Sequence, residues 1–543
     1  MDTEFFWHVI ILFVYTFLAH GVILFNDGLY WDGWLLNEWQ RKRDWKVMKR
    51  FFSEVGMPVL YFQHKIMSYL PGPILSYRLL ALISNFISAS AVYLIVSHFG
   101  FLNKTDSLIL ALLYLSYTGY HMNVDTIVGL QYTFPTAVFY TAVFLSLYAH
   151  SQGGSASLAI HGAAALLFLW SFNANSILVY YFAFLGLSVL YQVGWRIADV
   201  FAWKIILNNL VYGLLPFIYW IVKEKYSPRH GHYAEYNKIG LEPEKFVRSF
   251  FYAIRFGLEY SIVKPVLYVI NNTLITIPLL CVILLIVGRD NNLLSAVPAI
   301  KNTLPLILII VGTFLFVFAI LPYLLVGQPV NEHGWGTKNS MLIHLPVALI
   351  IMGVSNLFIH GINVVQNVLL FYLVAACIYN IRNYMYYLAV YVKDYSWLYQ
   401  VKNSKEADGA SIFQVIDNHL LTGDLVINYQ DYKSIYLVYM FDWIWETGPS
   451  EEPSRFGIRE FKARPAYTSQ ELVTAFRNTT MPYALTKVNP NLKQVRIIIN
   501  DGIGQPFYVV ALKYIKARYF SSNKNELTVL LGQVTNIELK VLD

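Results

Sequence analysis

The chain has 543 residues, of which 57% are hydrophobic and only 13% are charged, and its formal net charge is +7. A soluble globular protein carries about 25% charged residues, so this composition excludes an ordinary soluble domain over the whole length. The basic residues form no single stripe, and we therefore expect no nucleic acid among the partners.

Apolar runs near the ~20 residues that cross a hydrocarbon layer of ~30 Å recur along most of the chain. We predict eleven spanning helices, at 5–25, 76–98, 107–120, 132–149, 157–170, 174–193, 205–222, 266–287, 304–326, 340–359 and 366–391. The first run has neither the basic start nor the cleavage site of a signal peptide, so we expect it to be retained. The sequence thus predicts a polytopic α-helical membrane protein, with residues 1–395 as its transmembrane domain.

The loop after the first run, residues 26–75, begins with two carboxylates and continues with amphipathic sequence. Asp27 and Asp32 lie within Asn26–Trp34. Apolar residues between 35 and 55 fall on one helical side and basic residues on the other, which is typical of a helix lying in the membrane interface. A second amphipathic stretch covers 59–70.

Either carboxylate of this loop has two possible roles. A carboxylate within reach of a hydroxyl can remove its proton, as a general base does. Asp32 lies between Trp31 and Trp34, and Tyr30 precedes them. The alternative is structural, because Asp is also a favoured residue for capping a helix N-terminus.

Residues 223–265 form a long polar connection. His230 and His232, with Glu235 close behind, could hold a metal ion. Recognition of a phosphate by Arg229 and the neighbouring lysines is the interpretation that we favour. Arg78, at the head of the second span, is expected to be a snorkelling anchor or a member of an ion pair in the site.

The composition changes near residue 396, and residues 396–543 contain no run of spanning length. We predict a soluble α/β or α+β domain there. Helical periodicity marks 410–421, and short β-branched runs predict strands at 424–428, 495–500, 507–512 and 527–531.

An odd number of spans places the N-terminus and this C-terminal domain on opposite sides. With a cytoplasmic N-terminus, loops 26–75, 223–265 and 327–339 and the C-terminal domain share the extracytoplasmic face. The many basic residues of the first loop oppose the positive-inside rule, although that rule is weak for long loops. We expect a multi-pass protein of a prokaryotic plasma membrane.

A long first helix, an acidic motif directly after it, interfacial helices, further short-looped spans and a terminal soluble domain resemble the GT-C superfamily of membrane glycosyltransferases. The resemblance covers residues 1–390 by layout, and rests on Asn26–Trp34 with support from 331–338. It implies transfer of a sugar from a polyprenyl-phosphate-linked donor to a glycan, lipid or protein acceptor. The two carboxylates depart from the family pattern, since relatives often carry adjacent acidic residues.

The resemblance also implies roles for individual residues. Asp32 is the expected general base, with Asp27 as the fallback, and Asp125 of the next outer loop assists, with Mg²⁺ or Mn²⁺ as a possible cofactor. Lys338 and His333 are expected at the lipid phosphate. The complete expected sets are, for the phosphate, Arg229, Lys338, His333, His230, His232 and Arg78, and, for the sugar or acceptor, Trp31, Trp34, Tyr30 and Glu235.

Two other functions fit a chain of this kind. A lipid or solute transporter favours charged residues near the middle of discontinuous helices and repeated halves, whereas these spans are nearly free of charge and show no repeat. An O-antigen-type polymerase or ligase depends on a large periplasmic loop late in the chain. The early acidic motif and the terminal soluble domain of this chain argue against that function.

Overall fold

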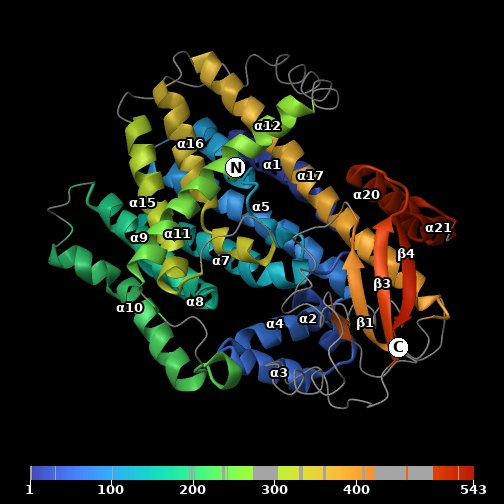
Figure 1. Ribbon diagram of the computed structural model, residues 1–543. Helices are drawn as coiled ribbons and strands as arrows, with labels where there is room; N and C mark the ends of the chain where they lie inside the picture. Colours follow the sequence, from blue (N-terminus) through green and yellow to red (C-terminus); the bar gives the residue numbers. More distant parts are fainter. Residues whose placement is uncertain are drawn as a thin grey trace.

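The computed structural model describes residues 3–30, 32–100, 102–194, 196, 200, 202–234, 239–240, 242–272, 304–328, 330, 334–358, 362–406, 410–419, 421, 460–462, 493–523 and 525–542. These residues form a helical bundle joined to a small mixed sheet (Figure 1). Within the described ranges, seven helical segments are long and apolar enough to cross a membrane: Thr3–Phe25, Pro73–His98, Thr126–Ser151, Gly154–Ser171, Trp203–Tyr226, Leu304–Leu325 and Asn367–Lys402.

The seven segments correspond to predicted spans. They lie in α1 (Thr3–His20) with η1 (Gly21–Phe25), α5 (Pro73–Phe99), α7 (Thr126–Ser151), α8 (Gly154–Ser171), α10 (Trp203–Tyr226), α15 (Leu304–Leu325) and α17 (Ile362–Lys402). The predicted class, a helical membrane protein, is confirmed at this level.

Three further predicted spans are shorter helices. They are α6 (Lys104–Leu115), α9 (Ser176–Gln192) and α16 (His344–Phe358). The predicted span 266–287 begins in α12 (Lys264–Asn271), and its remainder from residue 273 lies outside the described residues. The prediction from apolar length placed the end of the 107–120 helix too late, because the helix ends before Ser116.

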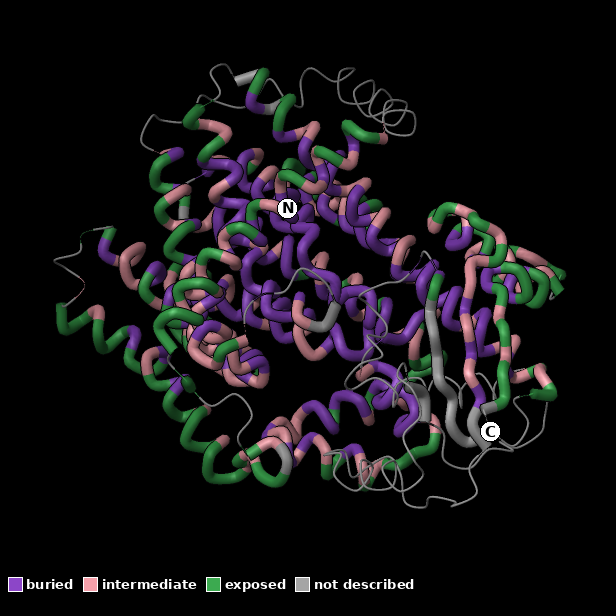
Figure 2. Tube along the Cα trace, in the orientation of Figure 1, coloured by how far each residue is buried: buried purple, intermediate pink, exposed green. Residues whose placement is uncertain are grey.

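The exposure of large apolar side chains supports a lipid environment around the bundle. Large apolar side chains are exposed on the outer faces of α8, α10 and α15, among them Leu158 at 73%, Val211 at 61% and Ile310 at 58%. The interior of the bundle is buried, whereas the peripheral helices carry exposed faces (Figure 2). Apolar faces of this size are costly in water and neutral in hydrocarbon.

The first loop folds as three short helices, not as one long helix and a second stretch. They are α2 (Asp32–Arg41), α3 (Trp45–Glu54) and α4 (Pro58–Met67). The single helix expected over 35–55 is interrupted because Arg43 adopts a left-handed conformation, with φ of 53°, and Asp44 caps α3 through the Val47 N–H. Pro58 occupies the first turn of α4, where its missing N–H costs nothing.

A buried polar network fixes these short helices to the bundle. The Tyr77 hydroxyl of α5 lies 2.6 Å from His64 Nδ1 and accepts a hydrogen bond from Gln40 Nε2 at 2.6 Å. Gln131 of α7 donates to His64 Nε2 at 3.1 Å. Burial lowers the pKa of His64 to about 3, so the ring is neutral and accepts this bond. The network joins α2, α4, α5 and α7.

The last long helix, α17, has 41 residues and runs through the predicted domain boundary at 395/396. Residues beyond it form a sheet of strand order β2-β1-β3-β4, built from β1 (Ala410–Asp417), β2 (Glu460–Lys462), β3 (Lys493–Asp501) and β4 (Thr535–Leu542). Strand β1 is parallel to β2 and β3, and β4 is antiparallel to β3.

The predicted elements beyond residue 396 are partly wrong. The strand at 495–500 is confirmed as part of β3, but the helix predicted at 410–421 is strand β1. The runs at 507–512 and 527–531, predicted as strands, lie in helices α20 (Phe507–Ile515) and α21 (Asn525–Val534), and 424–428 lies outside the described residues. Short apolar runs suit either structure, and here the contacts of α20 and α21 with α17 decide.

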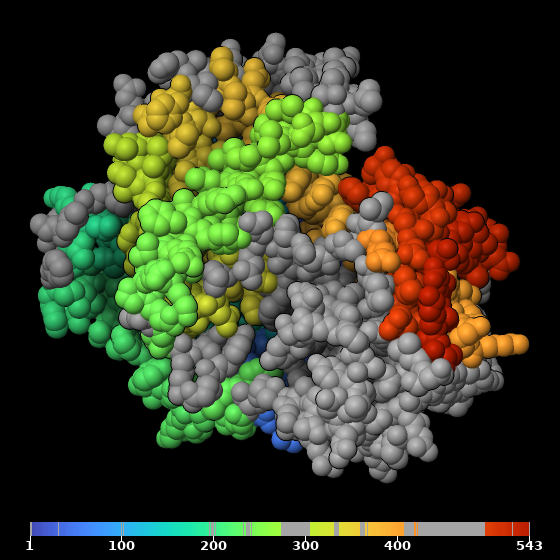
Figure 3. Space-filling view, in the orientation of Figure 1, coloured from blue at the N-terminus to red at the C-terminus, as the bar shows by residue number. Residues whose placement is uncertain are grey.

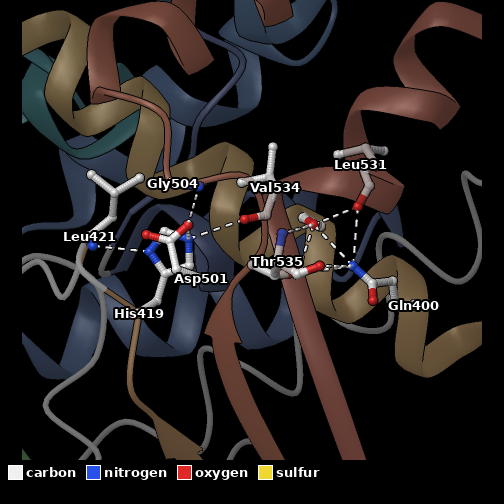
Figure 4. A network of polar contacts seen from close by, with 9 residues as sticks. Gln400, His419, Leu421, Asp501, Gly504, Leu531, Val534 and Thr535 are labelled. Carbon is white, nitrogen blue, oxygen red and sulfur yellow. Dashed lines mark hydrogen bonds and ion pairs between the residues drawn. The ribbon is translucent and has the colours of Figure 1, made fainter.

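Polar contacts attach this sheet to the end of α17. Gln400 of α17 donates to the carbonyl of Thr535 at 2.8 Å and to its hydroxyl at 3.0 Å (Figure 4). On the other side of β4, His419 Nε2 lies 3.2 Å from the Val534 carbonyl, and Asp501 accepts from the Gly504 N–H at 3.0 Å. The sheet is therefore joined to a helix that belongs to the bundle.

Candidate functional site

Asp27, the first carboxylate after α1, is held by two guanidinium groups. Arg78 of α5 donates to it through Nη2 at 2.7 Å. Arg518 of η7 (Lys516–Phe520), a π-helical turn directly after α20, donates through Nε at 2.9 Å. The hydroxyl of Tyr514 adds a third bond at 3.1 Å, and Arg78 Nη1 donates to the Tyr519 hydroxyl at 3.2 Å. We call these five residues the Asp27 cluster.

The Asp27 cluster changes the expected roles of two residues. Burial alone would raise the pKa of Asp27, but the charge of Arg78 and the hydrogen bonds from both arginines hold it below its usual value. A carboxylate with a lowered pKa and two cationic partners is a weak base. Arg78 is only 3% exposed, so the expectation that it snorkels is wrong, whereas the alternative of an ion pair is confirmed.

Asp125 contacts the first loop at Tyr30 and Gly33. It is fully buried and caps α7, accepting from the N–H groups of Ile127 and Val128 at 3.2 Å each. Its other oxygen accepts from the N–H of Tyr30 at 2.9 Å. The carboxylate lies against the backbone of Gly33, where a Cβ would fall 2.1 Å from Asp125 Oδ2. Asp125 therefore fixes the segment that carries Asp32.

Asp32 is the first residue of α2 and is partly exposed. Its charge is close enough to act on Asp125. Burial, with the nearby charge of Asp32, raises the pKa of Asp125 to about 7, against the lowering effect of its three N–H donors. The structure thus places two of the three predicted acidic residues near each other, since Asp125 packs against Gly33, the neighbour of Asp32. We call Asp32, which is partly exposed, and Asp125, which is buried, the carboxylate pair.

Replacement of Gly33 by alanine should disrupt this pair. The new Cβ would overlap the Asp125 carboxylate, which three N–H donors hold in place. We expect Gly33→Ala to lower the thermal unfolding temperature by several degrees, because overpacking costs about 1–3 kcal/mol. The control is Gly213→Ala, since nothing lies within 4 Å of a Cβ there. An equal unfolding temperature for both variants would contradict the close packing described.

The raised pKa of Asp125 predicts a pH dependence of stability. The carboxyl of Asp125 loses its proton near pH 3.8 in the unfolded chain and near pH 7 in the folded one. The stabilisation that protonated Asp125 gives is therefore complete below about pH 4 and is lost between about pH 4 and pH 7. Asp125→Asn removes the titration and keeps one of the two acceptor oxygens. Thermal shifts at pH 5 and pH 8 should show the wild type losing stability relative to this variant, by up to ~3 kcal/mol, because about two pH units of the titration lie between pH 5 and pH 7. Parallel pH profiles would contradict the raised pKa.

Two other connections reach the first loop and Asp125. One of them is the turn η6 (Gly334–Ser340), which packs on η2 (His121–Asn123), directly before Asp125. The His121 N–H donates to the Thr337 hydroxyl at 3.2 Å, and the Ser340 hydroxyl donates to the Gly119 carbonyl at 3.1 Å. Lys338 lies in this turn and is only 8% exposed.

The other is the connection after α10, which docks on the first loop. His230 donates its backbone N–H to the carbonyl of Glu54, at the end of α3, at 3.2 Å. The Tyr233 ring lies edge-on to Phe51 of the same helix, with ring centroids 5.8 Å apart. A backbone bond and an aromatic contact thus attach this connection to α3.

The predicted phosphate ligands belong to these two separate connections. Arg229 lies at the turn that follows α3, where a Cβ on Gly56 would fall 3.1 Å from Arg229 Cγ. Lys338 lies instead in η6, beside η2. A phosphate bound by both residues would therefore join the two connections.

The aromatic residues expected to face a sugar are buried instead. Tyr30 is fully buried and donates its hydroxyl to the Tyr387 carbonyl at 2.9 Å. Trp34 is 2% exposed and stacks on Tyr391 of α17 at 6.4 Å between centroids. Both attach the loop to α17, so the expectation of a sugar platform is wrong for these two. Trp31, Glu235, His333 and the side chain of His232 lie outside the described residues.

The described residues do not fit the metal ion considered from the sequence. No group of three or more His, Cys, Asp or Glu side chains within them could hold a metal. Both oxygens of Asp125 already accept N–H bonds. His230 is bonded through its backbone N–H to Glu54, at the end of α3. We therefore derive no step through Mg²⁺ or Mn²⁺.

Sequence reasoning missed the C-terminal members of the Asp27 cluster. Arg518 and Tyr514 are 491 and 487 residues from Asp27 along the chain. No spacing rule joins residues so far apart. An arginine directly before an aromatic pair, at 519–520, was the available signal, but it did not identify a partner.

Comparisons with protein-family models, with curated proteins and with solved structures found no match for this chain. The assignment of a function therefore depends on the geometry of the site.

Proposed function

We propose that this protein is an integral membrane glycosyltransferase that uses a polyprenyl-phosphate-linked sugar. The observation that carries the proposal is the carboxylate pair: Asp32 is partly exposed at the start of α2, and the buried Asp125 holds the segment around it through the N–H of Tyr30. The pair lies in connections between apolar helices, where a lipid-linked donor and a polar acceptor can meet. The acceptor is a glycan, a lipid or a protein that offers a hydroxyl group.

The proposed reaction is a displacement at the anomeric carbon. The Asp32 carboxylate takes the proton of the acceptor hydroxyl, and the acceptor oxygen forms the new bond to the anomeric carbon. The bond from that carbon to the phosphate oxygen breaks, and polyprenyl phosphate leaves with the electron pair. Asp125 is a positioning residue, since it holds the backbone at Tyr30 and Gly33 on either side of Asp32.

The leaving phosphate needs positive charge nearby, because a phosphate at a low-dielectric boundary is costly without paired donors. Lys338 in η6 and Arg229 beside α3 are the cations that we propose for this role, with His333 as a further member of the η6 connection. We further propose that this face is extracytoplasmic and that the membrane is a prokaryotic plasma membrane.

The donor can be tested directly by binding and transfer. The protein in nanodiscs is offered polyprenyl-phosphate sugars with a radiolabelled sugar, and transfer of the label into product is measured with a membrane extract as the acceptor source. We expect binding to weaken about tenfold or more in Lys338→Met and in Arg229→Ala, which corresponds to ~1.4 kcal/mol.

Arg248→Ala is the matched control, because Arg248 is exposed and paired with Glu244 on α11 (Pro243–Leu258). Donor binding that is unchanged in the Lys338→Met/Arg229→Ala double variant would remove the phosphate role of both residues. Binding without any transfer in the wild type would favour a lipid transporter.

A further inference from the structure

Arg382, in the middle of α17, is surrounded by aromatic rings from three elements. Its guanidinium carbon lies 5.3 Å from the ring centre of Tyr386, 5.5 Å from those of Tyr379 and Phe507, and 5.9 Å from that of Tyr268. Tyr379 and Tyr386 belong to α17, Tyr268 to α12 and Phe507 to α20. We call this arrangement the Arg382 cage.

The Arg382 guanidinium has more N–H donors than the described residues accept from. A guanidinium has five N–H donors. Within the described parts of the chain, Nη1 of Arg382 donates to Asn383 Oδ1 at 3.0 Å, and Nε is buried without an acceptor. The rigid fork of a guanidinium matches acceptors with two neighbouring oxygens, such as a phosphate group, so an unused edge can bind phosphate through two parallel hydrogen bonds.

Contacts between α1 and α17 place Arg382 near one end of the bundle. The Tyr15 hydroxyl donates to the Leu373 carbonyl, and further along both helices His20 Nδ1 lies 2.8 Å from the Tyr384 hydroxyl. The two helices therefore run in the same direction, and Arg382 lies near the level of His20. The apolar segment that begins with α1 ends at residue 25, five residues beyond His20. Arg382 therefore lies within about two helical turns of that end, a distance that a long arginine side chain can span toward the headgroups.

The neighbouring charges on α12 and η5 (Glu259–Val263) do not supply the missing anion. Glu259 already pairs with Arg255 at 3.2 Å and with Lys264 at 3.3 Å. Lys264 lies one helical turn before Tyr268, a member of the Arg382 cage. Among the described residues of α12, η5 and the cage, two cations thus pair with Glu259 and Arg382 is a third, so positive charge is in excess there and attracts an anion.

The cage lies where lipid can reach it. Helix α17 contacts both α12 and α20 (Figure 1), and a strip of α17 is visible between these two helices in the space-filling view (Figure 3). Arg382 itself is partly exposed. A guanidinium at a lipid boundary is costly unless it is paired, and a headgroup phosphate can supply that pair.

We propose that the Arg382 cage binds the phosphate of a membrane lipid headgroup. The site is separate from the Asp32–Asp125 pair and does not depend on the proposed function. The lipid phosphate accepts from the free edge of the guanidinium, and Lys264 contributes long-range attraction. The C-terminal helix α20 takes part through Phe507, so that a lipid bound here contacts both the bundle and the C-terminal part of the chain.

The test is native mass spectrometry of the full chain in detergent, titrated with phosphatidylglycerol, phosphatidylcholine, undecaprenyl phosphate or inorganic phosphate. We expect the anionic lipids to bind and Arg382→Gln to weaken that binding about tenfold, the loss expected for a charge-assisted hydrogen bond. Arg382→Lys keeps the charge without the planar fork and should weaken binding less. The matched control, Arg248→Gln, should bind lipid as the wild type does.

A photo-activated diazirine analogue of phosphatidylglycerol gives a second measurement, on the wild type alone. We expect labelling within α17, α12 or α20 around the cage. Preference for undecaprenyl phosphate over phosphatidylglycerol would identify the lipid as the carrier, and equal binding would identify a general phospholipid. Lipid binding unchanged by Arg382→Gln, labelling confined to other helices, or equally tight binding of inorganic phosphate would overturn the proposal and leave the cage as a packing contact.

Discussion

Asp32→Asn should lower the turnover of sugar transfer by about 10²–10⁴-fold, the range expected when a general base is lost. The asparagine has nearly the same shape and cannot take a proton, so the fold and donor binding should persist. Turnover and donor affinity are measured separately, with the radiolabelled donor in nanodiscs. Asp44→Asn is the matched control, because Asp44 lies in the same loop, is exposed and caps α3, a role that asparagine also fills.

The expected pattern distinguishes Asp32 from the other carboxylates. Near-wild-type turnover in both Asp32→Asn and Asp27→Asn would refute the proposed mechanism. Loss of turnover in Asp27→Asn alone, with its unfolding temperature unchanged, would return the role of base to Asp27. We expect instead that Asp27→Asn acts first on stability.

Asp27→Asn should destabilise the protein strongly, because it leaves the buried guanidinium of Arg78 without its counter-charge. Arg78 is 3% exposed and the Asp27 side chain 18%, and breaking a buried pair costs ~3–5 kcal/mol. Arg518 is 53% exposed, so Arg518→Ala should cost at most ~1 kcal/mol. Thermal unfolding in detergent should therefore rank Asp27→Asn well below Arg518→Ala.

A double variant separates a lost pair from a stranded charge. Asp27→Asn/Arg78→Met removes both charges and should recover part of the stability lost in Asp27→Asn, since an apolar replacement of a buried pair is often neutral. The lowered pKa of Asp27 also sets the direction of a pH effect on stability. The stabilisation from ionised Asp27 is present above about pH 4 and is lost as the pH falls further. A double variant less stable than Asp27→Asn would contradict this account of the cluster.

The apolar lengths predicted the bundle well because the membrane fixes the length of a spanning helix. Segments such as 76–98 and 205–222 lie within α5 and α10. The same reasoning failed beyond residue 396, where short apolar runs fit a strand or a helix equally. Residues 507–512 became helix α20 since their apolar face packs on α17, and the sequence does not record that partner.

The candidate site, like the fold, could be predicted only in part. Asp32 and Asp125 could be predicted because each lies at the start of a helix next to an apolar run. That the two meet depends on Gly33, whose missing side chain leaves room for the Asp125 carboxylate, and on the fold of the first loop. Tyr30 and Trp34 were misjudged because aromatic residues near a membrane surface also pack inward, here on residues 387 and 391 of α17.

The contact between Asp27 and Arg518 has a consequence for biosynthesis. The partners are 491 residues apart, and at ~5–20 residues per second a ribosome needs roughly half a minute to a minute and a half to cover that distance. Arg78 follows Asp27 by 51 residues, so the pair with Arg78 can form early in translation. The contact with Arg518 can form only after residue 518 has been synthesised. A nascent chain thus holds its first acidic loop incomplete until residue 518 has been synthesised and folded against it.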